Sequence, residues 1–151
     1  MKRMAEMGHG RAAPARHSES IESRENRWLK RFRAGLSGET APRRGEASDL
    51  DGEIAGVEGV RLVESALRSG VEILAVLFSE TGAKQISRLE RWIPPEARVL
   101  RTSDRLFASA SGTETPQGVA ALVRPRAAVF DDLMGGDPLI LVLAGDRKSV
   151  V

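Results

Sequence analysis

Apolar and polar residues follow two different patterns along this chain, and together they predict alternating strands and helices. Four stretches are rich in apolar residues and are predicted to be strands, and the one at 71–80 has the pattern of a strand buried on both faces of a sheet. They are "EIAGV" at 53–57, "VEILAVLFSE" at 71–80, "ARVLRT" at 97–102 and "VAALVR" at 119–124. Between them, apolar residues recur every three or four positions, which is typical of amphipathic helices.

Three helices are predicted to connect these strands. The first follows a turn at 58–59 and ends before Gly70. The second spans 82–93 and ends at Pro94, because proline cannot continue a helix. The third, "DRLFASAS", is short and has Ser103 as its N-terminal cap. The residues expected to face the core are Leu62, Val63, Ala66 and Leu67 of the first helix and Ile86, Leu89 and Ile93 of the second.

A helix between each pair of consecutive strands is typical of a parallel sheet, because parallel neighbours need a crossover connection. The pattern therefore predicts an α/β protein with a three-layer α/β/α sandwich and a largely parallel sheet. This domain is expected to span 53–124.

A basic amphipathic helix is predicted ahead of the domain, over 18–35. Ser18 or Ser20 would cap its first turn, and Gly35 would end it. Its apolar residues Ile21, Trp28, Leu29 and Phe32 fall on one arc, and its basic residues Arg24, Arg27, Lys30 and Arg31 fall on the opposite arc. We expect both tryptophans, Trp28 and Trp92, to pack in the core rather than to stack on bases.

The remaining segments are predicted to lie outside the folded core. Residues 1–17 are expected to be disordered, 36–52 a flexible loop and 125–138 a linker. The apolar run 139–145 has the pattern of a buried strand, but too few residues follow it to cover it or pair with it. We interpret that run as the first strand of a further domain that is missing, and 146–151, "DRKSVV", as a non-native tail.

Composition excludes several classes of function. The chain has no cysteine, which rules out disulfides, zinc–thiolate sites and thiol catalysis. Its two histidines, His9 and His17, lie in the polar N-terminal stretch and are interpreted as solvated, so no metal site is expected. No apolar run approaches the roughly 20 residues of a membrane span, and no secretion signal is recognisable. We therefore expect a cytoplasmic protein.

Charge is distributed unevenly between the two parts of the chain. Residues 1–45 carry 11 Lys and Arg against 5 Asp and Glu, whereas residues 46–151 carry 12 against 16. A basic arm of this kind favours polyanions, above all nucleic acid, because binding releases counterions from the phosphates. The same pattern also occurs in arms that only confer solubility, and both interpretations stay open from charge alone.

Three groups of residues are candidates for contact with nucleic acid. Arg24, Arg27, Lys30 and Arg31 are suited to contacts with the phosphate backbone that do not depend on sequence. At the turn, Gly59 would let backbone amides approach a phosphate, and Arg61 could bind a phosphate through two hydrogen bonds. The third group forms a turn before the last strand of the domain, where the amide of Gln117 suits base edges or a ribose 2'-hydroxyl. The second group comprises Glu58, Gly59 and Arg61. The third comprises Thr113, Thr115, Pro116, Gln117 and Gly118.

A purely structural interpretation of each group remains open at this point. The basic residues would form an ordinary solvated helix face. Glu58 would cap the following helix while Gly59 only turns the chain, and Gln117 would hydrogen-bond its own backbone within a rigid turn.

Three stretches in this order resemble the SpoU (TrmH-like) family of RNA ribose 2'-O-methyltransferases. They are "IESRENRWLKRFRAG", "VEGVRLVESALRSGVEILAVLFSE" and "TETPQGVAALV", followed by "PLILVLAG". The resemblance implies an RNA substrate-binding domain with the α/β/α fold of small ribosomal proteins that bind RNA. It also implies a separate catalytic domain, beginning with a strand like 139–145, that binds S-adenosylmethionine and forms homodimers. This chain lacks the catalytic and cofactor-binding residues of that domain, so we expect it to bind structured rRNA or tRNA, to bind no cofactor itself and to be inactive.

Two alternative functions differ in how well they fit the sequence. A stand-alone, non-enzymatic RNA- or ribosome-binding module fits the same residues. A nucleotide-binding enzyme with 139–145 as the first strand of a Rossmann unit fits poorly, because no Gly-x-Gly-x-x-Gly turn follows that strand.

Overall fold

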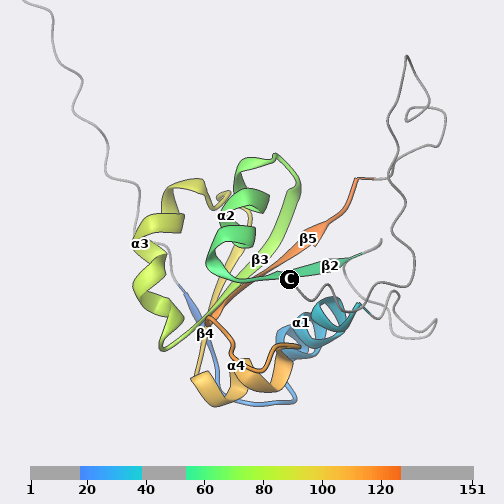
Figure 1. Ribbon diagram of the computed structural model, residues 1–151, viewed down its shortest axis with the longest axis vertical. Helices are drawn as coiled ribbons and strands as arrows, with labels where there is room; N and C mark the ends of the chain where they lie inside the picture. The colour runs from blue at the N-terminus through green and yellow to red at the C-terminus, as the bar shows by residue number, and fades with distance from the viewer. Residues whose placement is uncertain (1–17, 39–53, 127–151) are drawn as a thin grey trace, which may run out of the picture.

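Five strands form a single sheet in the computed structural model, which describes residues 18–38 and 54–126 (Figure 1). In chain order the elements are β1 (Glu19–Ile21), α1 (Arg27–Ser37), β2 (Ala55–Glu58), α2 (Val60–Arg68), β3 (Glu72–Ser79), η1 (Gly82–Gln85), α3 (Ile86–Leu89), η2 (Glu90–Trp92), β4 (Arg98–Thr102), α4 (Asp104–Ala110) and β5 (Val119–Arg124). The predicted tail 1–17, strand 139–145 and tail 146–151 lie outside the described residues. Most of the predicted loop 36–52 and linker 125–138 does so too.

The sheet is mixed, and the prediction of a largely parallel sheet was wrong. Its strand order is β1-β4-β3-β5-β2, and β5 runs antiparallel to both of its neighbours. The connection from β4 to β5 explains the error. Helix α4 has 7 residues, and at 1.5 Å per residue it extends about 10 Å. It does not return the chain to the starting end of β4, so β5 enters the sheet from the end at which β4 leaves it.

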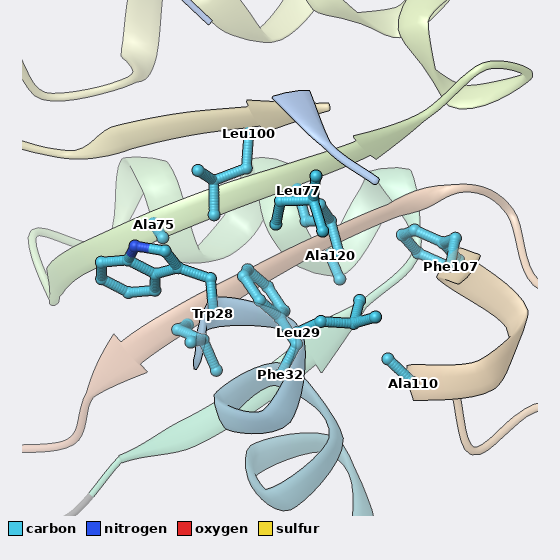
Figure 2. Packing of buried hydrophobic residues seen from close by; sticks show 11 residues of the cluster. Trp28, Leu29, Phe32, Ala75, Leu77, Leu100, Phe107, Ala110 and Ala120 are labelled. Atoms are coloured by element: carbon cyan, nitrogen blue, oxygen red, sulfur yellow. The ribbon is translucent and has the colours of Figure 1, made fainter. Parts of the chain in front are cut away.

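Helices cover both faces of the sheet, which confirms the predicted three-layer α/β/α arrangement. On one face, Trp28, Leu29 and Phe32 of α1 and Phe107 of α4 pack against strand residues (Figure 2). On the other face, Val63 and Leu67 of α2 and Leu89 of α3 form a second cluster. Strand β3 supplies both clusters, because alternate side chains of a strand point to opposite faces. The side chains of β3 that alternate in this way are Ala75 and Leu77 on the α1 face and Val76 and Phe78 on the α2 face.

The N-terminal segment belongs to this domain, and the helix predicted over 18–35 begins later than expected. Residues 19–21 form β1, which pairs with β4, and the hydroxyl of Thr102 donates a hydrogen bond to the carbonyl of Ile21 at 2.9 Å. Neither Ser18 nor Ser20 caps the helix. The cap is Asn26, whose side chain accepts a hydrogen bond from the Trp28 amide at 2.8 Å.

Gly35 does not end α1, contrary to the prediction. It lies inside the helix, where the absence of a side chain lets α1 approach β2 closely. A Cβ atom on Gly56 of β2 would lie 2.7 Å from the carbonyl carbon of Gly35, so the two backbones touch where α1 crosses the sheet. The helix ends instead at Gly38, whose φ of 69° is the left-handed conformation that suits a C-terminal cap.

Two predictions about the α2 and α3 side were also wrong. The side chain of Leu62 is 61% exposed rather than inward-facing, and Trp92 is 39% exposed rather than in the core. The predicted helix 82–93 is divided into η1, α3 and η2 and ends at Ile93, which is extended before Pro94. One predicted cap is confirmed, because the hydroxyl of Ser103 accepts a hydrogen bond from the Leu106 amide in the first turn of α4.

None of the helices in the described part of the chain is long and apolar enough to cross a bilayer.

If α1 is a structural layer of the domain rather than a separate arm, truncating its core residue should destabilise the whole fold. Phe32 is fully buried, and Phe32→Ala should lower the free energy of unfolding by about 3–5 kcal/mol. Leu62→Ala, at an exposed position, should lower it by about 0.5 kcal/mol or less. Urea denaturation of the full chain measures both values. Equal stability of Phe32→Ala and the wild type would show that α1 is not part of the cooperative unit.

Candidate functional site

Two turns that are far apart in the sequence meet at one end of the sheet. The first joins β2 to α2 at Gly59, and the second precedes β5 at Gln117 and Gly118. The Gly59 amide donates a hydrogen bond to the carbonyl of Val119 at 2.8 Å. Because β5 lies beside β2 and runs antiparallel to it, the two predicted groups of residues form one site.

The side chain of Gln117 caps the N-terminus of α2. Its Oε1 accepts a hydrogen bond from the amide of Val60, the first residue of the helix, at 3.2 Å, while the N-cap residue Gly59 has no side chain to contribute. Gly59 itself has a φ of 96°, and a Cβ atom there would lie 3.4 Å from that same oxygen. Gln117 therefore bonds a neighbouring segment of backbone rather than its own turn.

Glu58 holds the second turn instead of capping α2. Its two carboxylate oxygens accept hydrogen bonds from the hydroxyls of Ser111, at 2.7 Å, and Thr113, at 2.8 Å. Thr113 is thus a structural contact, while Thr115 is exposed and Pro116 half-buried in the same turn. The capping role proposed for Glu58 in the structural interpretation is not observed.

Close packing of the backbone after β3 against Gly118 also fixes the position of Gln117. The Ser79 amide donates to the Gly118 carbonyl at 2.8 Å, and the Gly82 amide donates to the Ser79 hydroxyl at 3.1 Å. A Cβ atom on Gly82 would lie 1.9 Å from the Gly118 oxygen, and Gly118 has a φ of 73°. Only glycine fits either position, so the turn before β5 is held rigidly.

Asp104 stabilises the same end of the sheet. Its carboxylate accepts hydrogen bonds from the Thr81 amide at 3.0 Å and the Thr81 hydroxyl at 2.8 Å. A hydrogen bond from Ser79, followed by those from Thr81, lowers the pKa of Asp104 below its usual value of 3.8.

An open hollow of about 440 Å³ lies where the two turns meet α2 and the helices after β3. Its lining residues are Glu58, Gly59, Val60, Arg61, Leu62, Gln85, Arg88 and Gln117. Sequence reasoning missed Gln85 and Arg88. The sequence did offer a signal for these two residues: they are three positions apart, which places both on the polar face of the predicted helix 82–93.

The basic residues predicted on the N-terminal helix do not join this hollow. Arg24 lies in the turn before α1, and Arg27, Lys30 and Arg31 lie on α1 itself, which covers the opposite face from α2. The ammonium of Lys30 pairs with Glu25 at 2.6 Å, which lowers the pKa of the Glu25 carboxyl. The guanidinium of Arg31 lies 4.9 Å from the ring centre of Trp28. These residues form a separate basic surface.

No group of three or more acidic or histidine side chains in the described ranges is arranged to hold a metal ion.

Because Gln117 caps α2, removing its side chain should cost stability. Gln117→Ala should lower the free energy of unfolding by about 0.5–2 kcal/mol, as loss of a helix cap does. Gln85→Ala is a matched control, since Gln85 lines the same hollow and makes no hydrogen bond from its side chain within residues 18–38 and 54–126. Thermal denaturation compares the two variants, and an equal effect of both would contradict the capping role.

The lowered pKa of Asp104 predicts a pH-dependent contribution to stability. The charged carboxylate is stabilised by folding, so its contribution is complete above the unfolded pKa and is lost as the pH falls through the folded pKa. The difference in melting temperature between the wild type and Asp104→Asn should therefore be largest at neutral pH and shrink below pH 3.8. A difference that stays constant over this range would refute the assignment.

Comparison with known proteins supports an RNA-related domain. Residues 54–121 match the family model of the MRM3-like substrate binding domain. A search of curated proteins found none that matches this chain.

Two solved structures share the fold. A crystal structure of an rRNA methyltransferase from Sinorhizobium meliloti is 19% identical, with a TM-score of 0.54, and covers 74% of this chain and 38% of its own. An AdoMet-bound rRNA methyltransferase from the same organism is 20% identical, with a TM-score of 0.56, over 76% of this chain and 40% of its own. The chain thus spans about two fifths of the length of these proteins. The match of 54–121 and the shared fold support the resemblance: this segment is similar to the substrate-binding domain of MRM3-like RNA methyltransferases.

Proposed function

We propose that this chain binds structured RNA as the recognition part of a ribose 2'-O-methyltransferase of the SpoU (TrmH-like) type that acts on rRNA or tRNA. The observation that carries the proposal is the hollow that brings Gly59, Arg61 and Gln117 together in a segment that matches the substrate-binding family. A shallow surface with exposed basic and amide side chains suits a large polar ligand, whereas sites for small molecules are enclosed and mostly apolar.

Three kinds of group at the hollow have the chemistry for RNA. The exposed guanidinium of Arg61 can bind a phosphate through two hydrogen bonds. The first-turn amides of Arg61 and Leu62 have no acceptor within the helix, and both residues line the hollow. Because Oε1 of Gln117 is held by the Val60 amide, its Nε2 group is oriented to donate a hydrogen bond to a base edge or a 2'-hydroxyl.

The basic surface of α1 is the second part of the proposal. Arg24, Arg27, Lys30 and Arg31 would contact the phosphate backbone without reading sequence. Because α1 covers the face opposite to α2, an RNA that touches both surfaces has to pass around the edge of the sheet.

Methyl transfer belongs to the proposed full-length enzyme. One related structure is described as AdoMet bound, and S-adenosylmethionine, when bound, would supply the methyl group. We propose that a separate domain holds this cofactor and forms a homodimer, while the residues described above bind and orient the RNA.

Direct binding to RNA tests the proposal. The full chain should bind a fluorescein-labelled RNA hairpin with an affinity that falls linearly with salt on logarithmic axes, because phosphate contacts release counterions. Arg61→Gln should lower the slope by about 1. Arg105→Gln, an equal change of charge at an exposed residue of α4 that belongs to neither proposed surface, should leave it unchanged. Fluorescence anisotropy at several salt concentrations gives these slopes, and the proposal fails if the wild type does not bind or if its binding is independent of salt.

A further inference from the structure

The exposed indole of Trp92 lies against two arginines. The guanidinium of Arg68, at the end of α2, is 5.3 Å from the ring centre, and that of Arg91, from η2, is 5.2 Å away. Trp92 is 39% exposed, so it does not serve chiefly to fill the core. The three residues form a surface cluster that links the end of α2 to the helices after β3.

Stacking on an indole orders a guanidinium and leaves its N–H edge available. An arginine held in this way is suited to phosphate, because its planar donors match two phosphate oxygens and part of its side-chain freedom is already lost. Within residues 18–38 and 54–126, neither Arg68 nor Arg91 pairs with a carboxylate. Both charges are therefore available to a ligand.

A groove along the exposed side of α2 connects this cluster to the hollow at Gln117. Its lining residues are Arg61, Glu64, Ser65, Arg68, Ser69 and Arg88. Arg61 and Arg88 also line the hollow, so the two depressions are adjoining. Glu64 is the acidic side chain in the lining, and it is already paired with Arg88.

The spacing along the groove fits a nucleic-acid strand. Arg61 and Arg68 are seven residues apart on one face of α2, which corresponds to about 10 Å along the helix axis. Successive phosphates of one strand in a duplex are separated by about 3.4 Å along its axis. The groove is therefore long enough to hold more than one phosphate.

We infer that the strand of RNA bound at the Gly59 and Gln117 hollow continues along α2, and that Arg68 and Arg91, ordered by Trp92, bind its phosphates. This inference rests on the proposed function and deepens it, because it gives the RNA a direction across the domain. It assigns contacts to the side of α2 that the sequence had not indicated, where Trp92 was expected in the core.

Tryptophan fluorescence of the full chain tests the inference. The chain has two tryptophans, and Trp28 is only 5% exposed, so acrylamide should quench mainly Trp92. The same RNA hairpin, extended by a single strand at either end, should protect the wild type from quenching. Trp92→Phe gives the level of quenching without that residue and keeps an aromatic ring for the two arginines.

Charge variants provide the second measurement. Arg68→Gln and Arg91→Gln should each lower the salt slope by about 1, as loss of a phosphate contact does, while Arg105→Gln, outside both proposed surfaces, should not. If the hairpin binds but leaves Trp92 equally quenchable and both slopes unchanged, the inference is wrong and the proposed function stands. If the hairpin does not bind the wild type, the proposed function itself fails.

Discussion

The antiparallel insertion of β5 between β3 and β2 is the constraint on which the site depends. It places the turn before β5 beside the start of α2, where the Gly59 amide bonds the Val119 carbonyl and the Val60 amide bonds Gln117. In a parallel sheet, the turn before β5 would lie at the opposite end. The close contact of Gly82 with Gly118 then holds that turn rigid, so the amide of Gln117 is oriented before any ligand arrives.

The two helical layers have different roles around this sheet. Helix α1 contributes Trp28, Leu29 and Phe32 to the core and approaches β2 so closely that Gly35 and Gly56 touch. Its basic residues are partly engaged, since Lys30 pairs with Glu25 and Arg31 stacks on Trp28. The α2 layer instead exposes Leu62, Trp92 and several arginines beside the hollow. The α2 layer is therefore the better candidate for specific recognition.

Apolar periodicity was enough to predict the strands β2 to β5 and the three layers, because each depends on local pattern. The cap at Ser103 followed from the preference of serine for that position. Pairing direction does not follow from apolar periodicity, which locates strands without orienting them. The shortness of the predicted helix "DRLFASAS" was the available signal for the reversal of β5. The three residues of β1 were too few to show a pattern and were absorbed into the predicted helix. The motif residues Gly59, Arg61 and Gln117 were identified from sequence, but Gln85, Arg88 and the exposure of Trp92 follow from how α2 packs against the helices after β3.

RNA is proposed to bind this domain on the α2 side, at the end of the sheet where the two turns meet. Nuclear magnetic resonance of the full chain, labelled with nitrogen-15 and titrated with an RNA hairpin, tests it most directly. The largest changes in chemical shift should occur at the Gly59 and Val60 amides, the Gln117 side-chain amide and the Trp92 indole. Changes confined to α1 and α4, with these four signals unmoved, would contradict the claim.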